Sequence, residues 1–220
     1  ILNKNIDAIV ISTPHTLHLK IIKFAAKHNK HIFCEKPFTC SKKEADIVCK
    51  LMKKEKKIFH FVNYEFVEID AFKLFKKKIL SKKIIINKIN LNWFIKIKRS
   101  NKSWKEIHKK GGGIMFNYVC HAVFYLEFIF GKIRSTNSNI YLNIKKNINF
   151  LSSTILFKSG LSAKIKISIN SNNKAIHELK AETDKFVYVL KSKVNSLSDQ
   201  FTIEKINKPL KKKAVNKKTL

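Results

Sequence analysis

The chain has 220 residues, and 45% of them are hydrophobic, which is enough to bury a core in one large or two small domains. Its formal net charge of +31 points toward nucleic acid, but the only arginines are Arg99 and Arg134, and lysines recur along nearly the whole chain. Because nucleic-acid surfaces favour arginine for its bidentate contacts, we expect no specific nucleic-acid partner.

Two further classes of protein are disfavoured. No apolar run approaches the ~20 residues of a membrane span, and the first residues lack the ordered regions of a signal peptide. The four cysteines include no C-x-x-C pair, so no paired metal-ligand spacing is present. We therefore expect a cytoplasmic protein with reduced thiols, no membrane partner and no metal site.

Residues 1–62 alternate apolar runs with segments of helical spacing. The expected strands are Ile6–Thr13, His31–Cys34 and Ile58–Val62, and the expected helices are His18–His28 and a segment from Ser41 to about Lys54. Ser41 and Glu44 have the spacing of a capping box at the start of the second helix. This βαβαβ order, with right-handed crossovers, predicts an α/β protein that begins with a doubly wound parallel sheet.

The pattern changes after residue 62. An amphipathic helix is expected at Ile69–Leu80, a long alternating strand at Ile84–Ile97, and a helical stretch from Gly111 to near Gly131. The strands expected after it are Ile140–Ile144, Leu151–Phe157, Ser162–Ile169, Ile176–Glu182, Phe186–Leu190 and Phe201–Ile206. Such short strands with polar turns predict a mainly antiparallel sheet. We expect domains at residues 1–62 and 63–207, followed by a lysine-rich tail at 208–220.

The segment Cys34-Glu-Lys-Pro37 ends the second expected strand. Ligands of open α/β sheets bind at the carboxyl ends of the strands, and the strand order brings Glu35 and Lys36 to that edge. Most lysines are solvated surface residues, which is the alternative for Lys36. Its place at the sheet edge makes it a candidate for chemistry.

The order of several motifs resembles the Gfo/Idh/MocA family of NAD(P)-dependent oxidoreductases. The motifs are Thr13-Pro-His-Thr-Leu-His18, Cys34-Glu-Lys-Pro37, Asn63-Tyr-Glu-Phe66, Ser103-Trp-Lys105, Gly111-Gly-Gly-Ile-Met-Phe-Asn-Tyr-Val-Cys-His121 and Tyr125-Leu-Glu-Phe-Ile-Phe-Gly131. Each motif alone is weak, but their order across a domain boundary is specific. The resemblance extends from Asp7 to about Ile206.

The resemblance implies a partial Rossmann domain followed by an α+β domain with an open, mostly antiparallel sheet, and an active site between them. It implies NAD or NADP as cofactor. The implied reaction is hydride transfer between the nicotinamide and a hydroxyl or carbonyl carbon of a sugar, polyol or nucleotide-sugar. A homo-oligomer assembled through the antiparallel sheet is also implied.

The family resemblance assigns roles to single residues. Lys36 and His121 match its catalytic positions, and Asn117 and Trp104 are expected on the substrate side. Pro14, His15, His18, Glu35 and Lys36 are expected at the cofactor.

Each role has a structural alternative. Pro14 and His15 can cap a helix, His18 and His121 can be packed histidines, and Trp104 can belong to the core. Asn117 stands where the family commonly has Asp, and an amide cannot take a proton. If Asn117 and His121 share a helix, their i,i+4 spacing places them on one face.

No G-x-G-x-x-G sequence occurs in the chain, although a dinucleotide fingerprint is expected after the first strand of a Rossmann domain. The chain also begins without Met. We therefore expect an N-terminally truncated member of the family, in which the first strands and the glycine-rich loop are absent. The alternative is a noncatalytic remnant that acts as a binding or assembly module through its open sheet.

Overall fold

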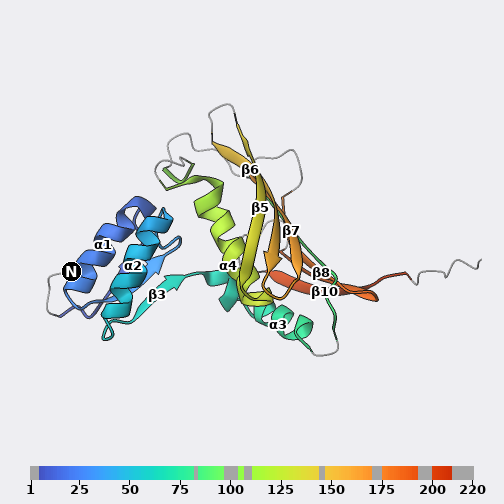
Figure 1. The fold of residues 1–220 in the computed structure, drawn as a ribbon, viewed down its shortest axis with the longest axis horizontal. Helices are drawn as coiled ribbons and strands as arrows, with labels where there is room; N and C mark the ends of the chain where they lie inside the picture. The colour runs from blue at the N-terminus through green and yellow to red at the C-terminus, as the bar shows by residue number, and fades with distance from the viewer. Residues whose placement is uncertain are drawn as a thin grey trace, which may run out of the picture.

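The computed structural model describes residues 5–81, 84–96, 104–106, 111–143, 147–169, 175–192 and 200–209. These residues form two sheets, one of three strands and one of seven, which lie side by side (Figure 1). The predicted fold class, a parallel Rossmann-type sheet followed by a mostly antiparallel sheet, is confirmed. Most of the predicted tail, from residue 210 onward, lies outside the described residues.

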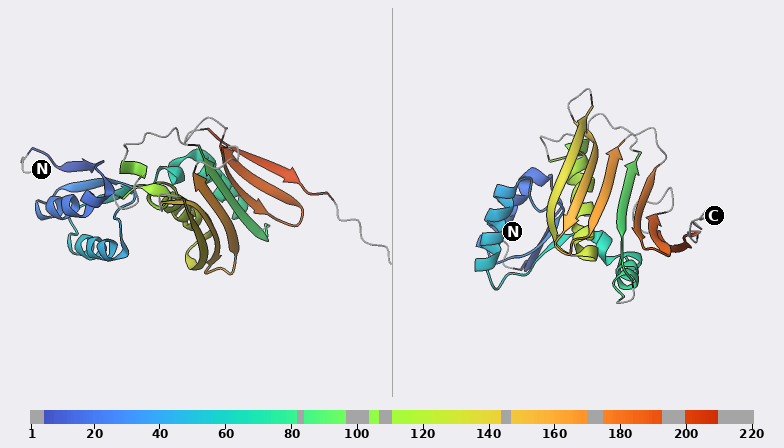
Figure 2. Two further views of the ribbon diagram at one scale, coloured as in Figure 1. Left: turned by 90° about the horizontal axis from the view of Figure 1, so that it is seen from above. Right: turned by 45° about the vertical axis from the view of Figure 1, so that its right-hand side comes forward.

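The first sheet contains β1 (Ala8–Ile11), β2 (His31–Glu35) and β3 (His60–Asn63), which pair in parallel in that order. Helix α1 (His18–Lys27) connects β1 to β2, and α2 (Lys42–Lys54) connects β2 to β3. Both helices lie on the same face of the sheet (Figure 2). Their apolar sides and the inward residues of the strands form one core, which contains Ile11, Ile22, Ala25, Ala26, Ile32, Cys34, Val48, Met52 and Ile58.

The other face of this sheet carries apolar side chains in contact with solvent. Val10 is 72% exposed, and Phe33 and Phe61, which stack with ring centroids 5.3 Å apart, are 38% and 50% exposed. Alternation along a strand explains this arrangement, because Ile9 and Ile11 point to the helices and Val10 points away.

The second sheet has the strand order β10-β9-β8-β4-β7-β6-β5. All of its neighbouring pairs are antiparallel except β4–β7, which is parallel. Its strands are β4 (Lys88–Ile95), β5 (Ile133–Leu142), β6 (Ile148–Phe157), β7 (Ser162–Ile169), β8 (Ile176–Glu182), β9 (Phe186–Ser192) and β10 (Phe201–Asn207).

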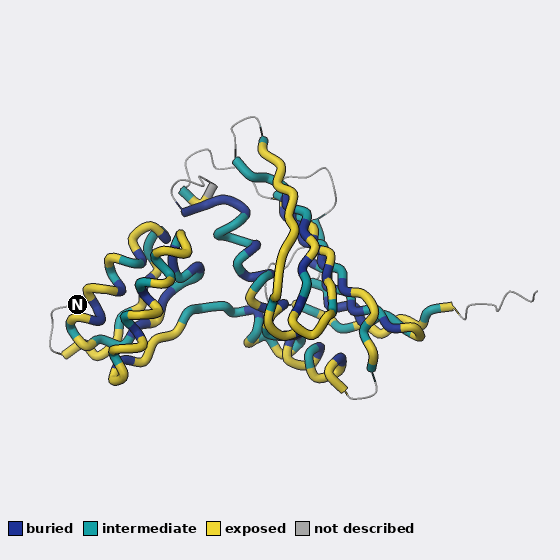
Figure 3. Tube along the Cα trace, in the orientation of Figure 1, coloured by how far each residue is buried: buried dark blue, intermediate teal, exposed yellow. Residues whose placement is uncertain are grey.

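Helices α3 (Asp70–Ile79) and α4 (Cys120–Phe130) share one large core with the inner face of this sheet. β4 shows why: Ile89, Leu91, Trp93 and Ile95 alternate with polar or half-buried residues, and all four are buried. On β7, Lys164 and Lys166 alternate with buried residues and point to the outer face. Figure 3 shows the resulting concentration of buried positions between the helices and the sheet.

Several strands differ from their predicted bounds by a few residues, and two elements differ more. Strand β5 begins at Ile133 rather than Ile140, and its bonds to β6 define it although nearly all of its side chains are exposed. A polar edge strand has no apolar alternation by which to recognise it. The helical stretch after the glycines contains a π-helix, η5 (Met115–Val119), before α4 begins.

Among the described residues, no helix combines the length and the apolar character that crossing a membrane requires.

Candidate functional site

A cavity of about 330 Å³ lies at the carboxyl ends of β1 and β2, where the two parts of the chain meet. It is lined by Ser12, Thr13, His15, Glu35, Lys36, Trp104, Lys105 and Asn117. The first five residues follow or end strands of the parallel sheet, and the others come from η3 (Trp104–Glu106) and η5. Five of the residues singled out from the sequence therefore surround one cavity.

Lys36 directly follows β2, and its Nζ donates a hydrogen bond of 3.1 Å to the backbone oxygen of Asn117. Glu35 accepts a 2.8 Å hydrogen bond from the side chain of Asn63, which ends β3. The bond between Lys36 and Pro37 is cis. Lys36 lines the cavity, and its ammonium group has three N–H donors, of which the bond to Asn117 uses one.

His15 forms a second wall of the cavity. Its Nδ1 lies 2.5 Å from the oxygen of Gly111, and its ring meets that of Trp104 edge-on at 5.0 Å. Burial, followed by smaller effects of His18 and Lys36, lowers the pKa of His15 to about 4, although its bond to Gly111 acts in the opposite direction. His15 is therefore neutral near pH 7, and one ring nitrogen can accept a hydrogen bond.

The glycines allow the chain to pass close to this wall. Gly111 has φ of +80°, and a Cβ on it would lie 3.0 Å from the Cβ of His15. A Cβ on Gly112 would collide with the backbone of Trp104 and Lys105. The three glycines are buried, so they do not form a solvent-exposed linker.

Asn117 points to the cavity, and its Nδ2 donates a 2.7 Å hydrogen bond to the backbone oxygen of Lys105. The amide thus joins η5 to η3 and fixes the position of Trp104 relative to Lys36. This hydrogen bond uses the amide nitrogen and leaves the carbonyl oxygen of the side chain as an acceptor.

His121 does not line this cavity. It is 3% exposed, and its Nε2 lies 3.6 Å from Oε1 of Glu65. Asn117 lies in the π-helix and His121 in α4, and the wider π turn changes the angular relation that i,i+4 residues have in an α-helix. Burial, then the positive charge of Lys36 and then His177, lower the pKa of His121 to about 2.

His18 and Pro14 also lie outside the cavity lining. His18 is fully buried, with Nδ1 3.0 Å from the oxygen of Pro37 and Nε2 3.1 Å from the oxygen of Thr13. It therefore links the end of β1 to the turn after β2. Pro14 is the residue before η1 (His15–Leu17). Direct contact of these two residues with a cofactor stays a prediction.

Glu65 and Asn63 were given no role from the sequence. Both come at or just after the carboxyl end of β3, so the strand-end rule that identified Lys36 also applies to them. The side chain of Glu65 is 42% exposed, but its Oε2 is buried and has no hydrogen-bond partner in the described part of the chain. Burial is also the main reason that its pKa is raised.

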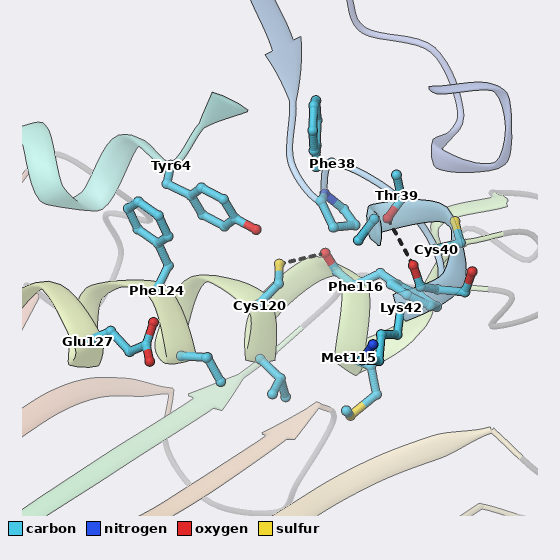
Figure 4. A pocket seen from close by; sticks show the side chains of 15 residues that line it. Phe38, Thr39, Cys40, Lys42, Tyr64, Met115, Phe116, Cys120, Phe124 and Glu127 are labelled. Atoms are coloured by element: carbon cyan, nitrogen blue, oxygen red, sulfur yellow. Dashed lines mark hydrogen bonds between the residues drawn. The ribbon is translucent and has the colours of Figure 1, made fainter. Parts of the chain in front are cut away.

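A second, mostly apolar groove of about 500 Å³ lies between the loop Pro37–Lys42 and one side of η5 and α4 (Figure 4). Tyr64 stacks on Phe124 at 4.0 Å along this groove, and the thiol of Cys120 donates to the oxygen of Phe116. Within the described parts of the chain, no cluster of three or more His, Cys, Asp or Glu side chains is arranged to hold a metal ion.

The sequence of the first sheet matches known proteins. Residues 1–64 match the model of the Gfo/Idh/MocA oxidoreductase family with its NAD-binding Rossmann fold. A 2,7-anhydro-N-acetylneuraminate hydratase of Escherichia coli (strain K12) is 27% identical over 145 residues, which make up 64% of this chain and 38% of that protein.

The fold is similar to solved structures over nearly the whole chain. The WlbA dehydrogenase of Bordetella pertussis, in complex with NADH and UDP-GlcNAcA, matches with a TM-score of 0.78 and 18% identity, covering 94% of this chain and 61% of that chain. Levoglucosan dehydrogenase, in complex with NADH and levoglucosan, matches with a TM-score of 0.73 and 16% identity, covering 94% and 62%. The chain spans less than two thirds of the length of each of these three proteins.

Proposed function

The chain is a relative of the Gfo/Idh/MocA oxidoreductases, and on that premise we propose that it forms the nicotinamide and substrate ends of an NAD- or NADP-dependent active site. The reaction is hydride transfer between the nicotinamide and a hydroxyl or carbonyl carbon of a sugar, polyol or nucleotide-sugar. The observation that carries the proposal is the cavity in which Lys36 from the first sheet faces Asn117 and Trp104 from the second part of the chain.

The residues at the strand ends fit the nicotinamide end of a dinucleotide. Ser12, Thr13 and His15 offer short polar groups beside Glu35, at the edge where α/β sheets bind cofactors. When bound, the cofactor supplies or accepts the hydride. The chain has no G-x-G-x-x-G loop, so these residues account for the nicotinamide half of the site and not for the pyrophosphate half.

Lys36 is proposed to hold the reacting oxygen of the substrate. An ammonium group fixed at the cavity wall stabilises the negative charge that develops on that oxygen. Asn117 offers an amide to a neighbouring hydroxyl, and Trp104 offers a flat apolar surface of the kind that sugar rings pack on. His121 stays the proposed base.

The first test is a titration of the chain with reduced nicotinamide mononucleotide, which probes the half of the site that these residues form. We expect NMR shifts in Ser12, Thr13, His15 and Lys36, and weaker binding when Lys36 is replaced by Met. Lys50→Met, an exposed lysine on α2, is the matched control. Shifts that avoid the cavity would contradict the proposal and favour the noncatalytic alternative.

The second test is turnover with NAD or NADP and a panel of sugars and polyols. Lys36→Met should lower kcat/KM by at least about 100-fold, a loss of about 2.7 kcal/mol of transition-state stabilisation. Lys50→Met should leave it unchanged. Turnover in the Lys36 variant within about tenfold of the parent would argue against the role of Lys36.

We further propose that copies of the chain associate through the outer face of the second sheet. Lys164 and Lys166 of β7 and Asn90 and Asn92 of β4 point to that face, which none of the described helices covers. Light scattering should then give a mass of at least two chains, and a monomer at every concentration would exclude the proposal. A cytoplasmic location stays a prediction.

A further inference from the structure

A carboxylate and an imidazole face each other just after the end of β3. Oε1 of Glu65 lies 3.6 Å from Nε2 of His121, and the two side chains come from η2 (Glu65–Glu68) and α4. Oε2 of Glu65 and Nδ1 of His121 are both buried, and neither has a hydrogen-bond partner among the residues that the structure describes. A buried polar atom without a partner is energetically costly, so such atoms commonly mark a functional site or bound water.

We propose that Glu65 is a positioning residue that keeps the proton of His121 on Nε2 and so leaves Nδ1 free to accept a proton from the substrate hydroxyl. The inference deepens the proposed function and rests on it. Glu65 acts through His121 in this proposal and does not itself line the cavity.

The position of the carboxylate favours one tautomer of the ring. An ionised carboxylate only accepts hydrogen bonds, so a ring nitrogen facing it is stabilised when it carries the proton. The ring nitrogen facing Glu65 is Nε2, which leaves the lone pair on Nδ1. The contact of 3.6 Å is longer than a hydrogen bond, as catalytic contacts often are before substrate binds.

The groups around His121 explain why a carboxylate is needed there. Burial and the neighbouring Lys36 and His177 disfavour the positive form of His121, and the rings of Tyr64 and Phe66 meet the imidazole edge-on. Cys120, which precedes His121, has a raised pKa of about 11 because of burial and is neutral near pH 7. Glu65 is therefore the group in contact with the ring that offsets an imidazolium charge.

The side chain of Asn117 cannot take this role. Its amide donates to the backbone of Lys105, and an amide has no charge to oppose an imidazolium. In the proposed step, substrate bound in the cavity must first reach Nδ1, which is buried without it. The O–H bond of the substrate then breaks and an N–H bond forms at Nδ1. The carboxylate of Glu65 stays ionised, so the charge of the imidazolium is balanced within the pair.

The direct test is the tautomer of His121, measured by NMR on the chain with ¹⁵N-labelled histidine and assigned with His121→Gln. We expect Nε2 to be protonated and Nδ1 to be unprotonated. Glu65→Leu should remove the preference, Glu65→Gln should reduce it because the charge is lost, and Glu65→Asp should retain it. Glu68→Gln is the matched control, since Glu68 lies on the same turn and pairs with Lys73 in solvent.

Two results would overturn the inference. One is a parent chain in which Nδ1 carries the proton. The other is a Glu65→Leu or Glu65→Gln variant with the tautomer populations of the parent. The measurement on the parent needs only the assignment of His121, so it decides the question even if a Glu65 variant does not fold.

Kinetics give an independent readout. Glu65→Gln should lower kcat by about 100-fold, the low end of what general base catalysis contributes, and should leave KM within about twofold. Glu65→Asp should restore most of the rate. Turnover that is absent with every substrate contradicts the proposed function, whereas turnover that is unaffected by Glu65→Gln contradicts this inference alone.

Discussion

The two sheets of the molecule differ in the size of their cores and in the side chains on their outer faces. The first sheet has three strands with α1 and α2 on one face, and its outer face exposes Val10, Phe33 and Phe61. The second sheet has seven strands, a core shared with α3 and α4, and an outer face with charged residues such as Lys164 and Lys166. A larger buried apolar area stabilises the second part more strongly.

The side chains that line the cavity are distributed differently between the two parts. Lys36, His15 and Glu35 belong to the smaller sheet, where polar residues at strand ends are not needed for packing. The larger part provides Trp104 and Asn117 on a segment that passes close to His15 because Gly111 and its neighbours allow it. The part with the larger core therefore supplies one wall of the cavity, and the smaller sheet supplies the polar side chains of the other.

The largest expected effect on stability comes from truncating a buried side chain in the second core. Phe75 of α3 is 0% exposed, and Phe75→Ala should lower the free energy of unfolding by about 3–5 kcal/mol because of lost burial and the cavity left behind. Urea unfolding followed by tryptophan fluorescence measures the loss, since Trp93 belongs to the same core.

Ile22→Ala in α1 is the matched change in the first core, where Ile22 is also 0% exposed. We expect a loss of about 2–5 kcal/mol and faster amide hydrogen exchange in the first sheet only. Equal acceleration in β8–β10 would show that the two cores unfold as one unit, which would contradict a difference in stability between them.

The next effect is a pH dependence that belongs to the second core. His177 stacks on Trp93 at 3.9 Å, and burial lowers its pKa to about 3 from a usual value of 6.5. The unfolded chain binds a proton at this histidine below pH 6.5 and the folded chain does not, so stability falls as pH decreases from 6.5 toward 3.

His177→Gln removes this dependence. The stability difference between parent and variant should therefore change by about 1.4 kcal/mol per pH unit below 6.5, or about 2 kcal/mol between pH 6.5 and 5. Urea unfolding at several pH values measures it. His60→Gln, an exposed histidine of β3, is the control and should keep the pH dependence of the parent. A variant curve parallel to that of the parent would show that His177 does not couple stability to pH.

The structure could be predicted from the sequence where a local rule determines it. The end of β2 brings Glu35 and Lys36 to the cavity, as strand-end placement predicted. The relation of Asn117 to His121 was not accessible, because the π-helix depends on how the segment packs after its glycines. Glu65 was missed for a similar reason, since its contact with His121 joins segments distant in sequence.

The smallest effect tests the local rule in the first sheet. Oγ of Ser41 accepts a hydrogen bond of 3.2 Å from the amide of Glu44, and the carboxylate of Glu44 accepts one of 3.0 Å from the amide of Cys40. The predicted capping box is thus present, although the return bond reaches one residue earlier than in the usual pattern. Ser41→Ala leaves a helix amide without this partner.

We expect Ser41→Ala to lower stability by about 1 kcal/mol, the typical contribution of an N-cap side chain. Hydrogen exchange should accelerate at the start of α2 and remain unchanged in the second sheet, because the cap belongs to the smaller core. Lys43→Ala, an exposed residue in the first turn, is the matched control. Faster exchange throughout β4–β9 in the Ser41 variant would mean that α2 also stabilises the larger core. The first sheet would then not be the less stable part of the molecule.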